Sequence, residues 1–457
     1  MAFASWRTLR EEKMDLGRDN IVKLIFYHSV PATVGMLVNA VYNLADRIFI
    51  GYAVGAEAFS SMSVASAVFL VLQAFGTWIG IGAASLIAIK MGEKRPQRVE
   101  ELIGGALVTL TTTSAVVFLG VSAFLDDVLY FFGASGSTIP YGREYLIVIA
   151  WGLPFMITGT GLYHINRVIG YPTEAMLFTA VSALLNVLLD FVFLFPFDMG
   201  IGGAALATVI SQFILLLCLL RLLLKKTTAY GVRLKNLKLR YRDALDIYIA
   251  GLSTFFTQVV SSLIAAAANN QLLRYENYFA VGAYGAINIT YSVVLMPVFG
   301  IGQGSQPIIG YNYGAKFYAR AREALYKSLL LAFLIGIGGW LLFHLQSVEV
   351  MSAITNGDGR IMSYAADGLE KLTLLFPLAT VQAVGQVYFQ SIGKPKKTLL
   401  LSVLRQTVFL IPMLYILPQF WGTDGVWYAI PVAEFLSLLC TGSFIAVENY
   451  RMRKYLG

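Results

Sequence analysis

Polar residues in the first long apolar segment share one face of a predicted helix. The stretch VNAVYNLADRIFIG carries four of them at spacing i, i+3, i+4 and i+7: Asn39, Tyr42, Asn43 and Asp46. Residues so spaced lie on one side of an α-helix. A charged aspartate at mid-bilayer costs about 2.5–3.5 kcal/mol, so intramembrane carboxylates are candidates for function. Asp46 is therefore a candidate to bind a proton or cation. The alternative is an interfacial carboxylate paired with Arg47.

A second carboxylate lies in another apolar stretch, LLNVLLDFVF. Asn186 precedes Asp190 by four residues and shares its helix face. Thr208, in GAALATVIS, adds a hydroxyl. With Asp46 these residues predict a polar chamber that shares one proton, because burial and a neighbouring carboxylate favour the neutral acid. Amide and hydroxyl oxygens also suit Na⁺. The alternatives are that Asp190 only joins helices and that Thr208 bonds its own backbone.

Pro31 lies in the first half of the segment that ends in Asp46. Proline removes a helical hydrogen bond and favours a kink. We expect a hinge whose bend responds to protonation; a static kink is the alternative.

The second half of the chain carries different polar residues. Its intramembrane positions hold mainly amides, which together with the first-helix stripe are candidates to line a substrate chamber: Gln258, Asn288, Gln382 and Gln386. Arg405 and Glu434 are the charged exceptions, and pairing is the simplest way to keep both in a membrane. The predicted ion chemistry is therefore asymmetric and lies mainly in the first half.

These residues must be positioned by membrane-spanning helices. The chain of 457 residues is 57% hydrophobic and 13% charged, whereas soluble domains are about 25% charged. A span needs about 20 apolar residues. Twelve are predicted, at 21–47, 57–89, 99–125, 140–168, 172–195, 201–224, 244–272, 278–311, 323–345, 364–391, 396–418 and 425–448.

The basic residues predict the orientation of these spans. With an inner N-terminus, the 34 Lys and Arg residues all fall on the inner side except five: Arg47, Arg143, Arg274, Arg360 and Lys371. Such asymmetry places both termini in the cytoplasm. The net charge of +8 is then an anchor to the inner leaflet and not a nucleic-acid surface.

The sequence repeats itself. VIGYPTEAMLFTAVSALLNVLLD resembles SIGKPKKTLLLSVLRQTVFLIPM, and Gly170 precedes its counterpart Gly393 by 223 residues. Six spans per repeat give two lobes of the same orientation with a cleft between them, where transporters bind substrates. The predicted parts are a cytoplasmic tail at 1–20, lobes at 21–224 and 244–450, a basic linker at 225–243 and a tail at 451–457.

The sequence lacks the patterns of an enzyme. The three histidines (His28, His164 and His344) are far apart, and there is no phosphate-binding P-loop. Two cysteines, Cys218 and Cys440, lie in apolar runs and form no metal cluster. We expect no cofactor and no catalytic residue.

Several motifs together resemble the multidrug and toxic compound extrusion (MATE) family and its DinF-like branch. They are YNLADRIFIG, the paired IGYPTEA and IGKPKK, NVLLDFVFLF followed by MGIGGAALATVISQ, and IGQGSQPIIGYNYGAK. The resemblance implies an all-helical antiporter with twelve spans in two six-helix lobes around a V-shaped cleft. It also implies a first-lobe cation site at Asp46, Asn186, Asp190 and Thr208, with Tyr42 nearby and Pro31 as the bending proline. The second-lobe carboxylates of the NorM branch are replaced by amides.

The predicted function is export of amphipathic, cationic or aromatic compounds in exchange for H⁺ or Na⁺. The predicted protein is a monomer surrounded by lipid in the inner membrane of a prokaryote, without nucleic acid. The alternative is a flippase for lipid-linked oligosaccharides. That activity needs a strongly cationic cleft, and interior basic residues are scarce.

Overall fold

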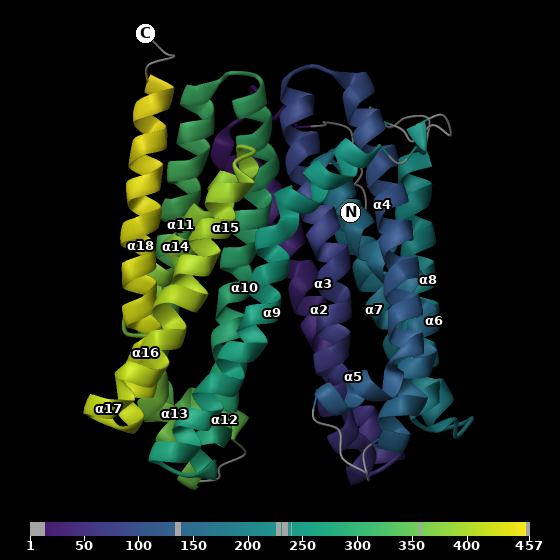
Figure 1. Ribbon diagram of the computed structural model, residues 1–457, viewed down its shortest axis with the longest axis vertical. Helices are drawn as coiled ribbons and strands as arrows, with labels where there is room; N and C mark the ends of the chain where they lie inside the picture. Colours follow the sequence, from purple (N-terminus) through teal and green to yellow (C-terminus); the bar gives the residue numbers. More distant parts are fainter. Residues whose placement is uncertain are drawn as a thin grey trace, which may run out of the picture. The chain divides into compact units, whose positions relative to one another are not determined.

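The described part of the chain is built from helices. In the computed structural model this part comprises residues 14–132, 139–224, 230, 236–238, 240–355 and 359–453, and it contains no strand (Figure 1). Eleven helices are long and apolar enough to cross a membrane, and one bent pair of helices gives the twelfth. The prediction of twelve spans in an all-helical membrane protein is confirmed.

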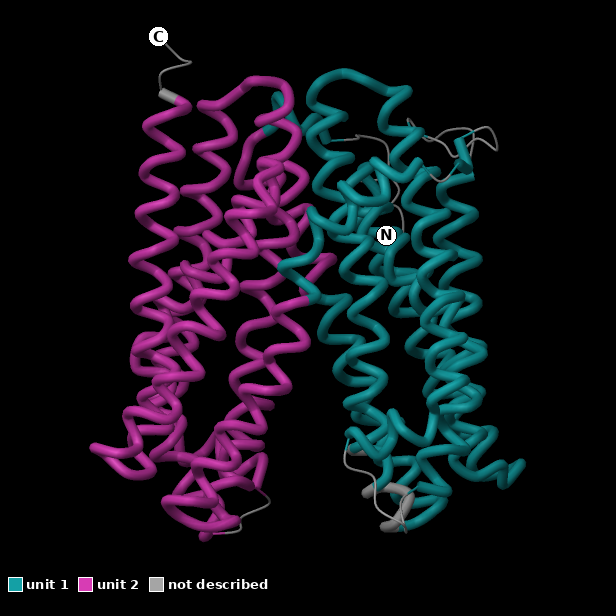
Figure 2. The backbone as a smooth tube through the Cα atoms, viewed as in Figure 1, with its two compact units in different colours: residues 1–19, 34–255 teal, residues 20–33, 256–457 magenta. Residues whose placement is uncertain are grey.

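The chain divides into two compact units, coloured separately in Figure 2. Unit 1 comprises residues 1–19 and 34–255, and unit 2 comprises residues 20–33 and 256–457. Two long helices belong to both units: α2 (Ile21–Ala53) and α9 (Tyr241–Tyr275). The first half of each helix belongs to one unit and the second half to the other.

The two units pack their own helices in the same way. Unit 1 contains α3 (Ala56–Gly92), α4 (Pro96–Ala123), α5 (Leu125–Phe131), α6 (Ile139–Val168), α7 (Pro172–Leu194) and α8 (Gly200–Leu224). Unit 2 contains α10 (Tyr278–Gly314), α11 (Tyr318–Leu345), α12 (Ser347–Ile354), α13 (Gly359–Leu372), α14 (Phe376–Ser391), α15 (Pro395–Val403), η2 (Leu404–Leu410), α16 (Ile411–Ile416), α17 (Pro418–Trp421) and α18 (Thr423–Arg453). In unit 1, α6 packs against α3, α4 and α8; in unit 2, α14 packs against α10, α11 and α18.

The internal repeat is visible in the backbone of the turns. Gly170 has φ 102° and Gly393 has φ 70°, the left-handed region that glycine adopts without strain. The residue after each glycine donates its backbone N–H to a carbonyl five residues earlier. Tyr171 donates to Asn166 at 3.0 Å, and Lys394 donates to Phe389 at 2.9 Å. Each turn is followed by a proline at the start of the next helix, where proline's missing N–H removes no hydrogen bond.

Glycines let the first half of α9 pack closely on α3 within unit 1. A Cβ at Gly251 would overlap the carbonyl oxygen of Trp78, and one at Gly82 would overlap that of Ile247. The Trp78 indole Nε1 also donates to the Tyr248 carbonyl at 2.7 Å. A side chain at either glycine would therefore push the two helices apart.

Unit 2 has the equivalent crossing between the first half of α2 and α10. A Cβ at Gly304 would overlap the Ser29 hydroxyl and lie 2.7 Å from the Ser29 amide nitrogen. Ser29 and Gly251 are 222 residues apart, as are Gly82 and Gly304. The first helix of each sequence repeat therefore begins against the second helix of the other repeat.

Two predicted spans are less regular than expected. Predicted span 10 is a pair of helices, α13 and α14, that meet at a 60° bend. Pro377 lies in the first turn of α14 and cannot donate the hydrogen bond that would continue α13. Predicted span 11 contains the π-helical turn η2. Pro412 follows that turn and cannot donate to the carbonyl of Val408, which removes one α-helical hydrogen bond.

The units do not coincide with the predicted lobes. The predicted lobes are separated by the linker at 225–243, whereas the units divide within α2 and α9. The lobe limits at 21–224 and 244–450 therefore stay a prediction about the sequence repeat. The predicted tails and the linker fall partly outside the described residues, at 1–13, 225–229, 231–235, 239 and 454–457.

Candidate functional site

The four predicted ion-binding residues all belong to unit 1. Asp46 lies in the second half of α2, Asn186 and Asp190 in α7, and Thr208 in α8. All four are buried, with Asp190 0% and Asp46 5% exposed. Asp46 is buried within unit 1, whereas its neighbour Arg47 is exposed.

Hydrogen bonds connect α7 to α8 at this site. The Asn186 amide Nδ2 donates to the Thr208 hydroxyl at 3.3 Å. One turn away, the Ser182 hydroxyl donates to the Ser211 carbonyl at 2.8 Å. The hydroxyl of Thr208 therefore faces across the helix pair towards Asn186.

Several buried oxygen atoms at this site have no hydrogen-bond partner among the described residues. They are both carboxylate oxygens of Asp190, Oδ1 of Asp46 and Oδ1 of Asn186. Burying a charged oxygen without a donor is costly, and buried polar atoms are normally satisfied. A proton on a carboxyl group or a hard cation bound by these oxygens would satisfy them. The donor set is all oxygen, which suits H⁺ or Na⁺ and not a soft metal.

The two carboxylates are close enough to interact electrostatically. Two buried phenols, Tyr42 of α2 and Tyr145 of α6, lie within the electrostatic reach of both. Tyr145 also contacts Thr208. Tyr145 was not predicted, because a single tyrosine in the fourth span has no periodic polar partner that would distinguish it from a packing residue.

A cavity of about 180 Å³ lies beside Asp46. Its polar lining comes from α2, α3 and α6: Asn43, Asp46, Arg47, Ser66, Gln73 and Tyr145. Gln73 was also missed by the sequence analysis, although Ser66 lies seven residues earlier on the same face of α3. The cavity places water-accessible volume next to the buried carboxyl group.

The predicted polar stripe of the first helix is divided by its packing. Tyr42 is buried together with Asp46, while Asn43 is exposed and Asn39 is half-buried. The Asn43 amide Nδ2 donates to the Asn39 backbone carbonyl at 2.7 Å. The stripe therefore presents two different surfaces, a buried one with Tyr42 and Asp46 and an outer one with the two asparagines.

The polar candidates of the second half of the chain lie in unit 2. The Arg405 guanidinium donates to Oε1 of Glu434 through Nε at 2.8 Å and Nη2 at 2.5 Å. The expected ion pair between these two residues is therefore present.

The four amides of this unit differ in their surroundings. Gln386 donates to the Ser402 hydroxyl, and Asn288 donates to the Tyr284 carbonyl at 3.1 Å. Gln382 is 0% exposed, and neither of its amide atoms has a partner among the described residues. Gln258 is half-buried. The structure thus brings these amides into unit 2 and the first-helix stripe into unit 1.

Pro31 is buried within the continuous helix α2. The division between the units falls just after it, between Thr33 and Val34. The proline therefore precedes the point at which α2 passes from unit 2 into unit 1.

Comparison with known families identifies the chain. The MatE family model matches residues 31–192 and 253–416, which is more than half of the sequence and covers both repeats. The chain belongs to the MatE family. The resemblance found in the sequence motifs is thereby confirmed, and the protein is a multi-pass membrane protein of a transporter family and not an enzyme.

Relatives of this MatE protein have similar length and fold. Multidrug export protein MepA of Staphylococcus aureus (strain NCTC 8325 / PS 47) is 26% identical over 432 residues, covering 92% of each chain. MepA of Staphylococcus saprophyticus is 24% identical over 428 residues, covering 92% of this chain and 93% of that protein. A multidrug resistance MATE transporter solved in an outward-facing conformation has a TM-score of 0.90 at 22% identity, covering 97% of this chain and 99% of the other.

Proposed function

We propose that this MatE protein is an antiporter that exports amphipathic, cationic organic compounds in exchange for H⁺ or Na⁺. The observation that carries the proposal is the pair of buried carboxylates in unit 1: both oxygens of Asp190 and Oδ1 of Asp46 have no hydrogen-bond partner among the described residues. The multidrug export named for the MepA relatives supports the class of substrate. Both termini are proposed to lie in the cytoplasm, as the distribution of basic residues predicts.

The proposed coupling uses residues that face one another in unit 1. Asp46 and Asp190 bind one proton or one Na⁺ between them, and Asn186 and Thr208 contribute their oxygens. Neutralising the pair removes the repulsion between two buried charges. The second half of α2 then packs closer to α7, and α2 bends next to Pro31, where its first half is held by Ser29 against α10.

The driving force depends on the charge of the substrate. One charge that moves down 100 mV supplies about 2.3 kcal/mol, which supports about a fiftyfold gradient of a neutral substrate. Exchange of one monovalent cation for one H⁺ or Na⁺ moves no net charge, so the concentration gradient of the ion drives that exchange. In the proposed cycle the ion binds on one side of the membrane and is released on the other, and the substrate site opens to one side at a time.

The decisive variant is Asp190→Asn. It keeps the shape and removes the charge, so we expect ion-driven export to be abolished while the protein stays folded. The measurement is efflux of a cationic dye from sealed proteoliposomes under separately imposed pH and Na⁺ gradients. Full export by Asp190→Asn would contradict the role of this carboxylate.

Asp198→Asn is the matched control. Asp198 is exposed in the loop that joins α7 to α8, with φ 47°, which asparagine adopts as readily as aspartate. We expect wild-type export from this variant. If neither gradient drives efflux by the wild-type protein, the antiport proposal is wrong.

A further inference from the structure

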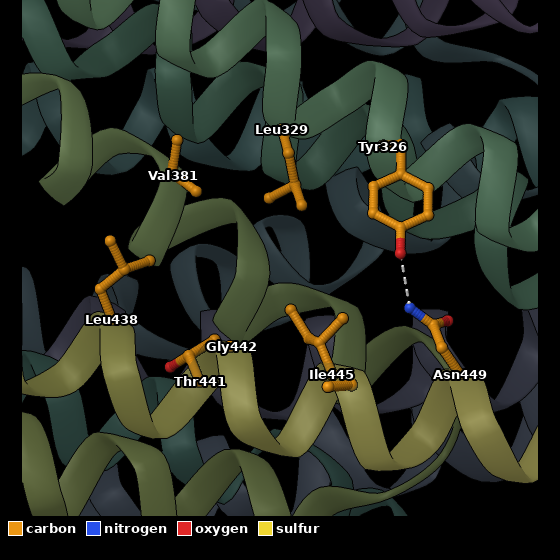
Figure 3. A pocket seen from close by; sticks show the side chains of 9 residues that line it. Tyr326, Leu329, Val381, Leu438, Thr441, Gly442, Ile445 and Asn449 are labelled. Carbon is orange, nitrogen blue, oxygen red and sulfur yellow. Dashed lines mark hydrogen bonds between the residues drawn. The ribbon is translucent and has the colours of Figure 1, made fainter.

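A second cavity, of about 270 Å³, lies between α11, α14 and α18 in unit 2 (Figure 3). Apolar side chains line most of it, among them Leu329, Val381 and Ile445. Ligand pockets for whole drug-sized molecules are commonly about 300–1,000 Å³. A cavity of this size with an apolar lining suits one flexible chain better than a bulky compound.

One end of the cavity is polar. The Asn449 amide Nδ2 donates to the Tyr326 hydroxyl at 2.9 Å, as Figure 3 shows. The phenol oxygen accepts this bond, so its hydrogen can be donated to a ligand. Oδ1 of Asn449 is buried at this end without a hydrogen-bond partner among the described residues. The hydroxyl of Thr441 also has no such partner, but it lies towards the Leu438 end of the lining (Figure 3).

The cavity runs lengthwise along α18. Its lining extends from Leu438 to Asn449, which is about 16 Å at 1.5 Å per residue. Half of the hydrocarbon core of a bilayer is about 15 Å. The cavity therefore has the length of one leaflet, with its polar end at the end of α18 near the C-terminus.

The surface around the cavity exposes large apolar side chains. On α11, Leu330 and Leu334 follow Tyr326 at four-residue spacing, and all three are more than half exposed. On α18, Leu439 and Val447 are likewise about half exposed. Exposed large apolar side chains at such spacing on a membrane-spanning helix contact acyl chains.

Basic residues lie near the polar end of the cavity, outside its lining. Lys394 and Lys397 both pair with Glu448, the residue before Asn449, which leaves one positive charge in excess. Arg322 lies one turn before Tyr326 on α11 and is half-buried. Basic pockets between helices at the cytoplasmic side of a membrane favour anionic lipid headgroups.

We propose that this crevice binds one anionic phospholipid of the inner leaflet. One acyl chain lies along Leu329, Val381 and Ile445. The ester oxygens accept from Tyr326, and a hydroxyl-bearing headgroup such as glycerol donates to Oδ1 of Asn449. The choice of leaflet rests on the proposed cytoplasmic termini, but the binding itself does not depend on transport activity.

Native mass spectrometry of the delipidated protein in detergent tests this proposal. The probes are dioleoyl phosphatidylglycerol and dioleoyl phosphatidylcholine, each titrated separately. We expect one phosphatidylglycerol per chain, bound at least tenfold more tightly than phosphatidylcholine. Equal binding of the two lipids by the wild-type protein would overturn the assignment of an anionic headgroup.

Gly442→Leu is the blocking variant, because a Cβ at this lining position meets no atom within 4 Å and the side chain enters the crevice. Gly338→Leu is the matched control, since Gly338 of α11 is equally open, exposed and outside the lining. We expect at least tenfold weaker phosphatidylglycerol binding for Gly442→Leu and no more than a twofold change for Gly338→Leu. Equal binding by both variants would overturn the site.

Two further variants separate chain from headgroup. Ala446→Leu fills the crevice at another exposed lining position and should weaken the binding of both phosphatidylglycerol and phosphatidylcholine. Arg322→Gln should reduce only the preference for phosphatidylglycerol. If a transported cationic dye competes with phosphatidylglycerol and Gly442→Leu weakens dye binding equally, the crevice is a substrate site and the lipid assignment is wrong.

Discussion

At the scale of single residues, the two units stabilise their buried carboxylates differently. Oε1 of Glu434 accepts two hydrogen bonds from Arg405. Both oxygens of Asp190 have no such donor among the described residues. A guanidinium supplies the counter-charge and the hydrogen bonds that a buried carboxylate needs, whereas a carboxylate without a donor is satisfied by a proton or a bound cation. This difference explains why ion coupling is proposed for unit 1.

Glu434→Leu should destabilise the protein by about 3–5 kcal/mol, because it leaves Arg405 buried without a counter-charge. The measurement is reversible denaturation in detergent micelles. The double variant Arg405→Met with Glu434→Leu should recover most of the loss, since neither charge remains. A double variant as unstable as the single one would contradict the ion-pair interpretation.

Thr208→Val should lower the rate of ion-driven export about two- to tenfold, the range expected for losing one hydrogen bond of about 0.5–1.5 kcal/mol. Valine has a similar shape but cannot accept the bond from Asn186. Thr208→Ser keeps the hydroxyl and should retain most of the activity in the same efflux assay. Equal rates for the two variants would show that the hydroxyl has no role.

At the scale of elements, the glycine crossings hold the first half of α9 on α3 and the first half of α2 on α10. Gly251→Ala places a methyl group against the Trp78 carbonyl. Such overpacking costs about 1–3 kcal/mol, and a lower thermal unfolding temperature in detergent is expected.

Gly285→Ala is the control, because a Cβ at Gly285 meets no atom within 4 Å. That variant should be neutral or stabilised by about 0.5–1 kcal/mol. A stable Gly251→Ala protein would argue against this close packing.

At the scale of the whole molecule, the predicted orientation puts the segment before α4 on the cytoplasmic side and the end of α11 on the outer side. Gln97 and Gln346 are both exposed, at the start of α4 and just after α11. In a background with Cys218→Ala and Cys440→Ala, Gln97→Cys should react with a membrane-impermeant maleimide only after the cells are opened. Gln346→Cys should react in intact cells. The reverse pattern would place both termini outside.

The sequence by itself determined the twelve spans, the internal repeat, the family and the ion pair in unit 2. Apolar length defines a span without reference to its neighbours. The glycine and proline of IGYP and IGKP end and begin helices through local backbone geometry, so the repeat is visible in both sequence and structure. Arg405 and Glu434 could be paired because two opposite charges in adjacent spans have few other ways to be satisfied.

Only the tertiary structure decided which polar residues share a site. Helical spacing grouped Asn43 with Asp46, but packing of α2 buried one and exposed the other. Tyr145 joined the site because α6 packs against α8, a contact that no spacing within one helix records. The division of α2 and α9 between the units was also not predicted. Each outcome depends on close packing between helices far apart in the sequence, whereas sequence periodicity describes only one helix at a time.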